Sequence, residues 1–229
     1  SLSFDDLGYV DCGYNPNLNS DNSNLTISMK FNVEDVEDIS NPNLIRKREN
    51  YDEFNGYQIR IAGSSYINPN GITIIADGAG SGNQSGKNIQ NDSKVAGDDK
   101  LHYLTVTYNV DGFMTLYLDG AKIDSTEIIN VESMNNSENL IIGNGHHNSD
   151  SGNGTVDDII IWDRVLSYTE IQNNISSEQN ISSNGMLVQY KFNAGSGDIL
   201  YDHSGNGNHG TINGATWVEI IYGCTDELA

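Results

Sequence analysis

The sequence predicts an all-β protein in which two sheets pack face to face or one sheet closes into a barrel. Apolar residues recur at every second position in short runs, which is the period of a strand with one buried face. Turn-forming residues separate these runs: Gly occurs 24 times and Asn, Ser and Asp are abundant, whereas Pro occurs 3 times. Only one segment carries a helix-start signal, and strands never alternate with helices, so a sandwich or a barrel is expected.

The first half of the chain contains the clearest alternating run. In the stretch L-T-I-S-M-K-F, which begins at Leu25, every second residue is apolar, so one face of a strand is expected to be buried. Similar runs follow at residues 57–61 and 72–75. Residues 77–99 are rich in Gly, Asn and Asp, and we expect a long loop there.

Residues 101–123 predict a three-stranded antiparallel meander. Two pairs, Asp111-Gly112 and Asp119-Gly120, separate three β-rich runs. Asp-Gly is a strong hairpin signal, because both residues of a tight hairpin turn must accept a positive φ.

The second half adds further strands and the single helix. Strands are expected at residues 139–142, 156–162 and 186–192, which are rich in β-branched and aromatic residues. In S-Y-T-E, Ser167 precedes Glu170 by three residues, as in a capping box, where the hydroxyl and the carboxylate bind free amides at a helix start. We therefore expect one short helix to begin here.

The charge of the chain argues against two classes of binding partner. The formal net charge is −21, from 32 acidic and 11 basic residues, and such a surface repels nucleic acids and anionic membranes. No apolar run is long enough to cross a membrane, so we expect no membrane insertion. Because the chain starts at Ser1 rather than at Met, we expect a piece of a larger polypeptide. Two cysteines, Cys12 and Cys224, leave their pairing open.

Three stretches together resemble one known family. Residues 1–13 read S-L-S-F-D-D-L-G-Y-V-D-C-G, residues 154–171 read G-T-V-D-D-I-I-I-W-D-R-V-L-S-Y-T-E-I, and residues 190–217 contain Y-K-F-N, D-H-S-G-N-G-N-H-G and N-G-A-T-W. These stretches resemble signatures of the laminin G-like group of concanavalin A-like proteins, which includes the pentraxins. The resemblance implies a two-sheet antiparallel jelly-roll β-sandwich with one short helix.

The order of these signatures differs from the family pattern. The S-G-N-G-N segment usually precedes the opening strand, whereas here it comes last. We expect residues 185–218 to fold back and complete a single domain over residues 1–218, because an orphan strand would expose sheet edges. The alternative is a truncated second repeat. Residues 219–229 resemble the start of a linker or of a short repeat.

The same C-terminal segment raises a second interpretation. Gly205, Gly207 and Gly210 have the G-x-G-x-x-G spacing of dinucleotide sites. Such a site needs a helix that opens directly on the glycines, whereas turn and strand residues follow Gly210. We therefore interpret these glycines as turn residues.

Catalysis is not expected. Glucanases among the resembled proteins carry acids in E-x-D-x-E or E-x-D-x-x-E patterns on one strand, so that two carboxylates flank the scissile bond. The nearest stretch, E-D-V-E-D at residues 34–38, has neither spacing and follows a strand. We interpret it as a solvated acidic loop, and we expect a protein that is not an enzyme.

Calcium is the cofactor that the resemblance implies. Related sandwiches often hold a structural calcium between the last core strand and the opening strand, and Ca²⁺ prefers carboxylate, amide and carbonyl oxygens. By position, the expected ligands are Asp5, Asp157 and Asn193. The alternative is that the acids flank a strand and bind local amides.

The resemblance also implies a ligand site at the rim of the sandwich. The matching segments carry planar hydrogen-bonding groups and an aromatic ring, which suit a sugar. The expected ligand-binding residues are Tyr51, Asp52, Asn144, His146, Asn148 and Asp150. The alternative is an Asn- and Gly-rich loop that binds no ligand.

Together these observations predict a non-catalytic, extracellular, lectin-like module of a larger surface or secreted protein. Its expected partners are a glycan or cell-surface polysaccharide, Ca²⁺ and neighbouring domains of the same polypeptide. The alternative is a protein-binding or spacer domain of an adhesin or of a virion surface protein, because one sandwich fold hosts several functions.

Overall fold

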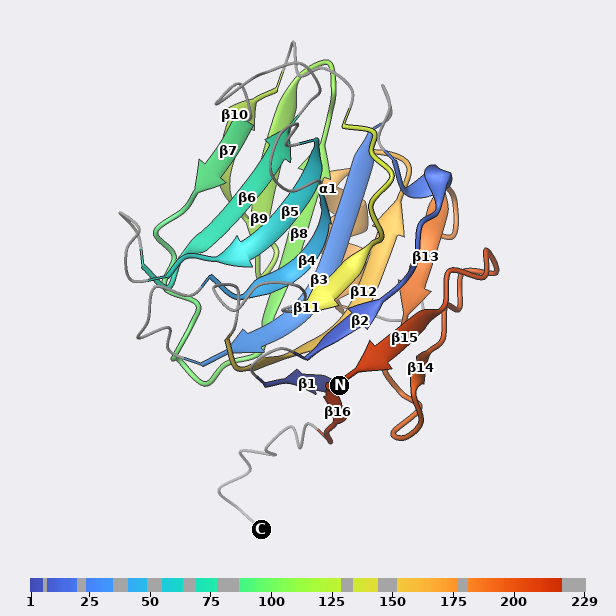
Figure 1. The fold of residues 1–229 in the computed structure, drawn as a ribbon. Helices are drawn as coiled ribbons and strands as arrows, with labels where there is room; N and C mark the ends of the chain where they lie inside the picture. The colour runs from blue at the N-terminus through green and yellow to red at the C-terminus, as the bar shows by residue number, and fades with distance from the viewer. Residues whose placement is uncertain are drawn as a thin grey trace.

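The structure, a computed structural model, describes most of the chain. The described residues are 1–5, 8–19, 24–34, 41–48, 55–63, 69–77, 87–128, 134–143, 152–176 and 181–219. They form two antiparallel sheets of eight strands each, packed face to face (Figure 1). The predicted two-sheet β-sandwich is therefore confirmed.

Sheet A lies at the back in the view of Figure 1. Its strands, in spatial order, are β10 (Ala121–Glu127), β9 (Phe113–Leu118), β8 (His102–Tyr108), β3 (Leu25–Val33), β12 (Gly154–Trp162), β1 (Leu2–Phe4) and β16 (Thr216–Trp217), with β13 (Met186–Tyr190) beside β12.

Sheet B lies at the front in the same view. Its strands, in spatial order, are β14 (Ile199–Leu200), β15 (Gly210–Asn213), β2 (Tyr9–Asp11), β11 (Ile141–Gly143), β4 (Asn43–Arg48), β5 (Gly56–Ile61), β6 (Ile72–Asp77) and β7 (Lys87–Gln90). Strand β7 lies inside residues 77–99, so the expectation of one long loop there is wrong: Ile89 is buried and its strand pairs with β6.

The core lies between the sheets. In β3 the alternating residues Leu25, Ile27, Met29 and Phe31 are all at most 1% exposed, as the period-two pattern predicted. The partner strand β8 pairs with β3 over its full length, from Leu25 opposite Tyr108 to Phe31 opposite His102.

The meander β8–β9–β10 is confirmed, with one difference in turn geometry. Asp119 and Gly120 have φ of 50° and 83°, as a tight hairpin turn requires. Neither Asp111 nor Gly112 has a positive φ. The first turn is wider, because Asn109 and Phe113 close it through a backbone hydrogen bond of 3.1 Å.

The C-terminal segment contributes strands to both sheets. Strand β13 pairs with β12, β16 pairs with β1, and β15 pairs with β2. Figure 1 shows the red C-terminal strands β15 and β16 beside the blue N-terminal strands β2 and β1. The two ends of the described chain therefore meet at one edge of the sandwich.

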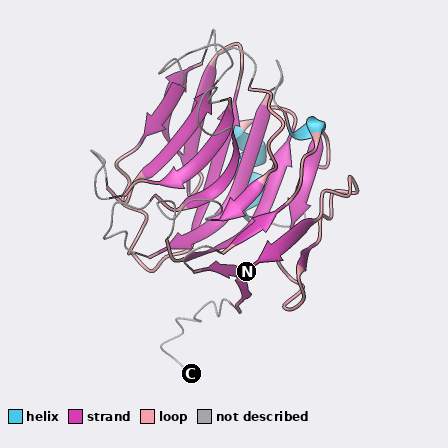
Figure 2. Ribbon diagram, viewed as in Figure 1, coloured by secondary structure: helices cyan, strands magenta, loops and turns pink. Residues whose placement is uncertain are grey.

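Helix α1 (Tyr168–Ser176) covers part of the outer face of sheet A, behind the strands in Figure 2. Its buried Ile171 packs with Ile160, Trp162 and Leu166 in a second apolar cluster outside the main core. A 3-10 helix at Pro16–Leu18, which the sequence analysis did not predict, precedes β3. Among the described residues, no helix is long and apolar enough to cross a membrane.

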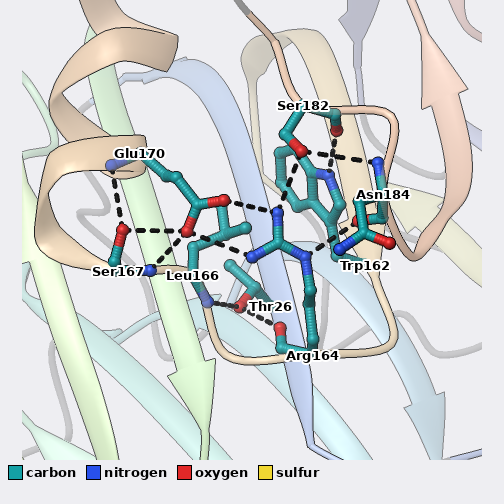
Figure 3. Close-up of polar contacts among 8 residues, drawn as sticks. All are labelled: Thr26, Trp162, Arg164, Leu166, Ser167, Glu170, Ser182 and Asn184. Atoms are coloured by element: carbon teal, nitrogen blue, oxygen red, sulfur yellow. Dashed lines mark hydrogen bonds and ion pairs between the residues drawn. The ribbon is translucent and has the colours of Figure 1, made fainter.

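The predicted capping box at the start of α1 is confirmed (Figure 3). The Ser167 amide donates to Glu170 Oε2 at 2.8 Å, and the Glu170 amide donates to Ser167 Oγ at 3.3 Å. Arg164 adds two hydrogen bonds to the same carboxylate, at 2.6 and 3.1 Å. Hydrogen bonding by Arg164 is the main cause that lowers the pKa of Glu170 to about 2.

Candidate functional site

A β-bulge in β12 places two successive acids on the outer face of sheet A. Strand alternation would point one of Asp157 and Asp158 into the core. In the register with β3, however, Asp157 pairs with Lys30 and Ile160 pairs with Ser28, so β12 carries one extra residue. Asp158 has a φ of 46°, a conformation that Asp tolerates better than most residues. Bulges re-aim side chains in this way, and both carboxylates face outward as a result.

A cavity lies over this bulge. Its volume is about 680 Å³, which is within the range of small-molecule sites. Strands β3, β8, β12 and β13, the last turn of α1 and the segment after β13 line it. The lining residues are Lys30, Tyr103, Asp157, Asp158, Ile160, Asn174, Ile175, Ser176, Ile181, Gln189, Tyr190, Lys191, Phe192 and Asn193.

A smaller cavity of about 430 Å³ adjoins it. The two cavities share Asp157, Phe192 and Asn193 as lining residues, so these residues form the wall between them. Trp217 of β16 lines the smaller cavity, and its indole N–H donates to the Gly197 carbonyl at 2.8 Å. The other lining residues are Ser1, Gly195, Val218 and Glu219. We call the two cavities together the sheet A cleft.

Charged and polar groups in the cleft are held in place by specific contacts. Lys30 Nζ lies 2.5 Å from Asp158 Oδ2, and both side chains are about a quarter or less exposed, at 22% and 24%. Asp157 accepts hydrogen bonds from the Ser1 hydroxyl at 2.6 Å and from the Asp158 amide at 2.9 Å. Burial raises the pKa of Tyr103, so its phenol stays neutral and can both donate and accept a hydrogen bond.

The structure brings together two of the three predicted calcium ligands. Asp157 and Asn193 both line the smaller cavity. Asp5 follows β1, in which Leu2 pairs with Val156 and Phe4 pairs with Gly154. This antiparallel register carries Asp5 away from Asp157 along β12, and Asp5 lines neither cavity.

The residues of this wall offer the type of ligand atom that calcium prefers, but too few of them. Asp157, Asn193 and Glu219 offer hard oxygens, which Ca²⁺ prefers, but the ion takes six to eight of them. Within the described residues, no group of three His, Cys, Asp or Glu side chains is arranged to hold a metal. An ion at Asp157 and Asn193 would therefore need water or ligand oxygens to complete its shell.

The six predicted ligand-binding residues, Tyr51, Asp52, Asn144, His146, Asn148 and Asp150, lie outside the described residues. The described strands show where their segments start. Arg48, which precedes residues 49–54, pairs with Gly56 at one end of β4. Gly143, which precedes residues 144–151, follows Ile142, whose partner Ile45 lies towards the other end of β4. Arg48 and Gly143 thus lie towards opposite ends of this strand.

Sequence reasoning missed most residues of the cleft. Lys30, Tyr103 and Gln189 come from strands that are far apart in the sequence, and no local pattern connects them. Two signals were available: the Asp-Asp pair of β12, whose side chains can both face outward only if the strand contains a bulge, and the final Trp of N-G-A-T-W, which is Trp217.

Known structures of similar fold include sugar- and receptor-binding domains. A candidate carbohydrate binding protein from Bacteroides ovatus matches with a TM-score of 0.67 and 16% identity, over 94% of this chain and 58% of that chain. The botulinum neurotoxin serotype D ligand binding domain, solved with N-acetylneuraminic acid, matches with a TM-score of 0.55 and 17% identity, over 70% of this chain and 38% of that one.

A third structure is the binding domain of botulinum neurotoxin DC in complex with rat synaptotagmin II. It matches with a TM-score of 0.52 and 21% identity, over 67% of this chain and 35% of that chain. This chain therefore spans less than two thirds of the length of each of these proteins. At such identities the likeness shows a shared fold. No curated protein sequence matches the chain.

The sequence itself matches one family. The laminin G family model described as the concanavalin A-like lectin/glucanases superfamily matches residues 7–172, which is more than half of the chain and includes the D-D-I-I-I-W-D-R segment after Val156. The motif resemblance is thereby confirmed, and the chain belongs to the concanavalin A-like lectin/glucanase superfamily.

Proposed function

We propose that the chain is a non-catalytic, extracellular carbohydrate-binding module of a larger surface or secreted protein, and that a glycan binds in the sheet A cleft. The observation that carries the proposal is the lining of the smaller cavity, where Trp217 stands with the carboxylate of Asp157 and the amide of Asn193. An aromatic ring supports the apolar face of a sugar, and planar polar groups bind its hydroxyls.

Proteins of similar fold support the proposal that the chain binds a carbohydrate. Solved structures of the same fold include a candidate carbohydrate binding protein and a toxin domain solved with N-acetylneuraminic acid. The net charge of −21 and the absence of a membrane-spanning helix in the described residues suit a module that acts outside the membrane. Because one sandwich fold hosts different functions, the cleft residues carry the argument and the fold supports it.

A glycan array tests the proposal directly. The full chain is applied once with calcium and once with a chelator, beside the variants Asn193→Ala and Trp217→Ala. We expect wild-type binding, and at least tenfold weaker binding by both variants, because each removes a contact in the cleft. Phe113→Ala is the matched control, since Phe113 is 51% exposed and does not line the cleft. The absence of any signal in both conditions would contradict the proposal that the chain binds a sugar.

We also propose that Ca²⁺ binds at the wall between the two cavities, where Asp157 and Asn193 supply oxygens. Binding to the folded state alone must raise the melting temperature, so a calcium titration of thermal stability is the test. We expect a rise at millimolar calcium that disappears in Asp157→Asn. If the melting temperature of the wild type does not change on adding calcium, the proposed calcium site is wrong.

A protein-binding function is the second candidate. It is favoured by the similar neurotoxin domain that was solved in complex with rat synaptotagmin II. Binding to a cell-surface protein that persists after enzymatic removal of its glycans would favour this candidate. A hydrolysis screen on β-glucans, which we expect to be silent, separates both candidates from an enzyme of the same superfamily.

A further inference from the structure

The sheet A cleft has two compartments, each large enough for its own ligand unit. The cavities measure about 680 and 430 Å³, and small-molecule sites typically occupy about 300–1,000 Å³. Three residues belong to both compartments: Asp157, Phe192 and Asn193. A ligand confined to one compartment would leave the other filled with water only.

Each compartment is lined by an aromatic side chain that does not line the other compartment. Tyr103 of β8 lines the larger cavity and not the smaller one, whereas Trp217 of β16 lines the smaller cavity and not the larger one. The wall between them carries one carboxylate and one amide, Asp157 and Asn193. Groups of this kind bind the hydroxyls that flank a linkage between two sugar units.

The net charge of the chain selects against acidic ligands, because the charges of the cleft itself are largely paired. Three carboxylates line the cleft, on Asp157, Asp158 and Glu219, and two of them are already paired, Asp158 with Lys30 and Asp157 with the amino group of Ser1 at 3.7 Å. The chain as a whole carries a net charge of −21. The overall field of the chain therefore disfavours an anionic sugar.

We propose that the ligand of the sheet A cleft is a neutral oligosaccharide, of which at least two consecutive units bind at once, one in each compartment across the wall formed by Asp157 and Asn193. This inference rests on the proposed carbohydrate-binding function and specifies its ligand class. Linking two units makes the second binding event intramolecular, so a linked pair binds far more tightly than either unit alone.

Chain length is the variable that tests the inference. Calorimetric titration of the full chain uses the cello-, manno- and malto-oligosaccharide series from one to six units, together with every neutral array glycan that binds and its constituent monosaccharides. We expect affinity to rise at least tenfold from one unit to two or three units and then to level off. Equal affinity for a monosaccharide and its oligosaccharides overturns the inference while leaving the proposed function intact.

Two variants give an independent readout. Trp217→Ala and Tyr103→Phe each alter one compartment, so each should reduce the gain with chain length while leaving monosaccharide binding in the other compartment unchanged. A uniform loss for all lengths, or preferential binding of sialylated over neutral glycans, overturns the inference. If no glycan of any length binds, the proposed function fails and the inference fails with it.

Discussion

Asp202, in the S-G-N-G-N signature, is a buried carboxylate surrounded by hydrogen-bond donors. It is 8% exposed, and it accepts from the amides of Gln189, Ser204 and Asn208 at 2.9–3.0 Å and from the Ser204 hydroxyl at 2.8 Å. Burial alone would raise its pKa, but these hydrogen bonds hold the pKa of Asp202 below its ordinary value. The signature is therefore a turn organised by one carboxylate, and its glycines are turn residues.

Replacing that carboxylate tests its structural role. In Asp202→Asn, an NH₂ group would face amide donors, so we expect a loss of about 2–3 kcal/mol in the free energy of unfolding. Urea unfolding followed by circular dichroism measures it. The neighbouring His203 is exposed, and His203→Ala should leave the stability unchanged. Equal stability of both variants would contradict this interpretation of the signature.

Glu170 makes stability depend on pH in the acid range. Its pKa falls from 4.5 to about 2, mainly through hydrogen bonding by Arg164 and then by Ser167. Since the folded-state pKa is the lower one, the stabilisation is fully present above about pH 5 and is lost as the pH falls towards 2. With its side chain 31% exposed, we expect about 1–2 kcal/mol after solvent screening.

The variant Glu170→Gln isolates this contribution. Its free energy of unfolding should lie about 1–2 kcal/mol below that of the wild type at pH 7, and the difference should shrink towards zero near pH 2. Glu127→Gln, at an exposed position of β10, is the control. A difference that stays constant over this pH range would show that the charge of Glu170 does not contribute.

At the scale of single elements, two buried threonines differ in whether their hydroxyl groups have hydrogen-bond partners. Thr26 of β3 is fully buried, and its hydroxyl donates to the Arg164 carbonyl at 2.6 Å and accepts from the Leu166 amide at 3.1 Å (Figure 3). Thr73 of β6 is 1% exposed, and within the described part of the chain its hydroxyl oxygen has no hydrogen-bond partner. An unmade hydrogen bond of this kind is costly.

Two isosteric substitutions should therefore act in opposite directions. Thr73→Val removes an unsatisfied hydroxyl and should raise the free energy of unfolding by about 1 kcal/mol. Thr26→Val leaves the Arg164 carbonyl and the Leu166 amide without their partner and should lower it by roughly 1–3 kcal/mol. Chemical denaturation of both variants measures the two effects, and a loss of similar size in both would contradict the distinction.

At the scale of the whole molecule, the chain closes on itself. Strands β13, β15 and β16 complete both sheets beside β12, β2 and β1. Val188, Tyr190 and Leu200 of this segment are at most 1% exposed and belong to the main core. We propose that residues 1–218 are one folding unit, although the family match ends at residue 172.

A truncated chain tests this unity. A chain of residues 1–184 lacks β13 to β16, which leaves residues 159–162 of β12 unpaired on one side and the core apolar residues uncovered. We expect no cooperative thermal transition by circular dichroism and rapid amide exchange throughout. A chain of residues 1–219 should melt like the full chain. A cooperative transition of the 1–184 chain would support a separate second repeat instead.

Local patterns were sufficient to predict most strands, the helix cap and the family, but not β4. Its sequence N-L-I-R-K-R carries three successive basic residues, which do not alternate with apolar ones. Lys47 is nevertheless fully buried, because its ammonium group donates to Asn136 Oδ1 at 2.8 Å and to the Glu138 carbonyl at 3.0 Å. These acceptors lie about ninety residues away in sequence, so no local pattern could predict the burial.

The cleft was beyond sequence reasoning for the same reason. Two of its residues, Asp157 and Asn193, were expected at one site and line one cavity. Their neighbours Tyr103 and Trp217 arrive through strand pairings that only the folded sheet establishes. Asp5 was placed by its position near the opening strand, but the antiparallel register of β1 carries it away from Asp157.

The central claim, that a glycan binds in the sheet A cleft, has one direct test. The chain contains 2 tryptophans, and Trp217 lines the cleft whereas Trp162 is 0% exposed beneath α1. In a ¹⁵N-labelled sample titrated with the tightest-binding neutral array glycan, each indole N–H gives its own NMR signal. We predict that the Trp217 signal shifts as glycan is added until binding is saturated, while the Trp162 signal stays in place. Saturable glycan binding that leaves the Trp217 signal unmoved would contradict the account.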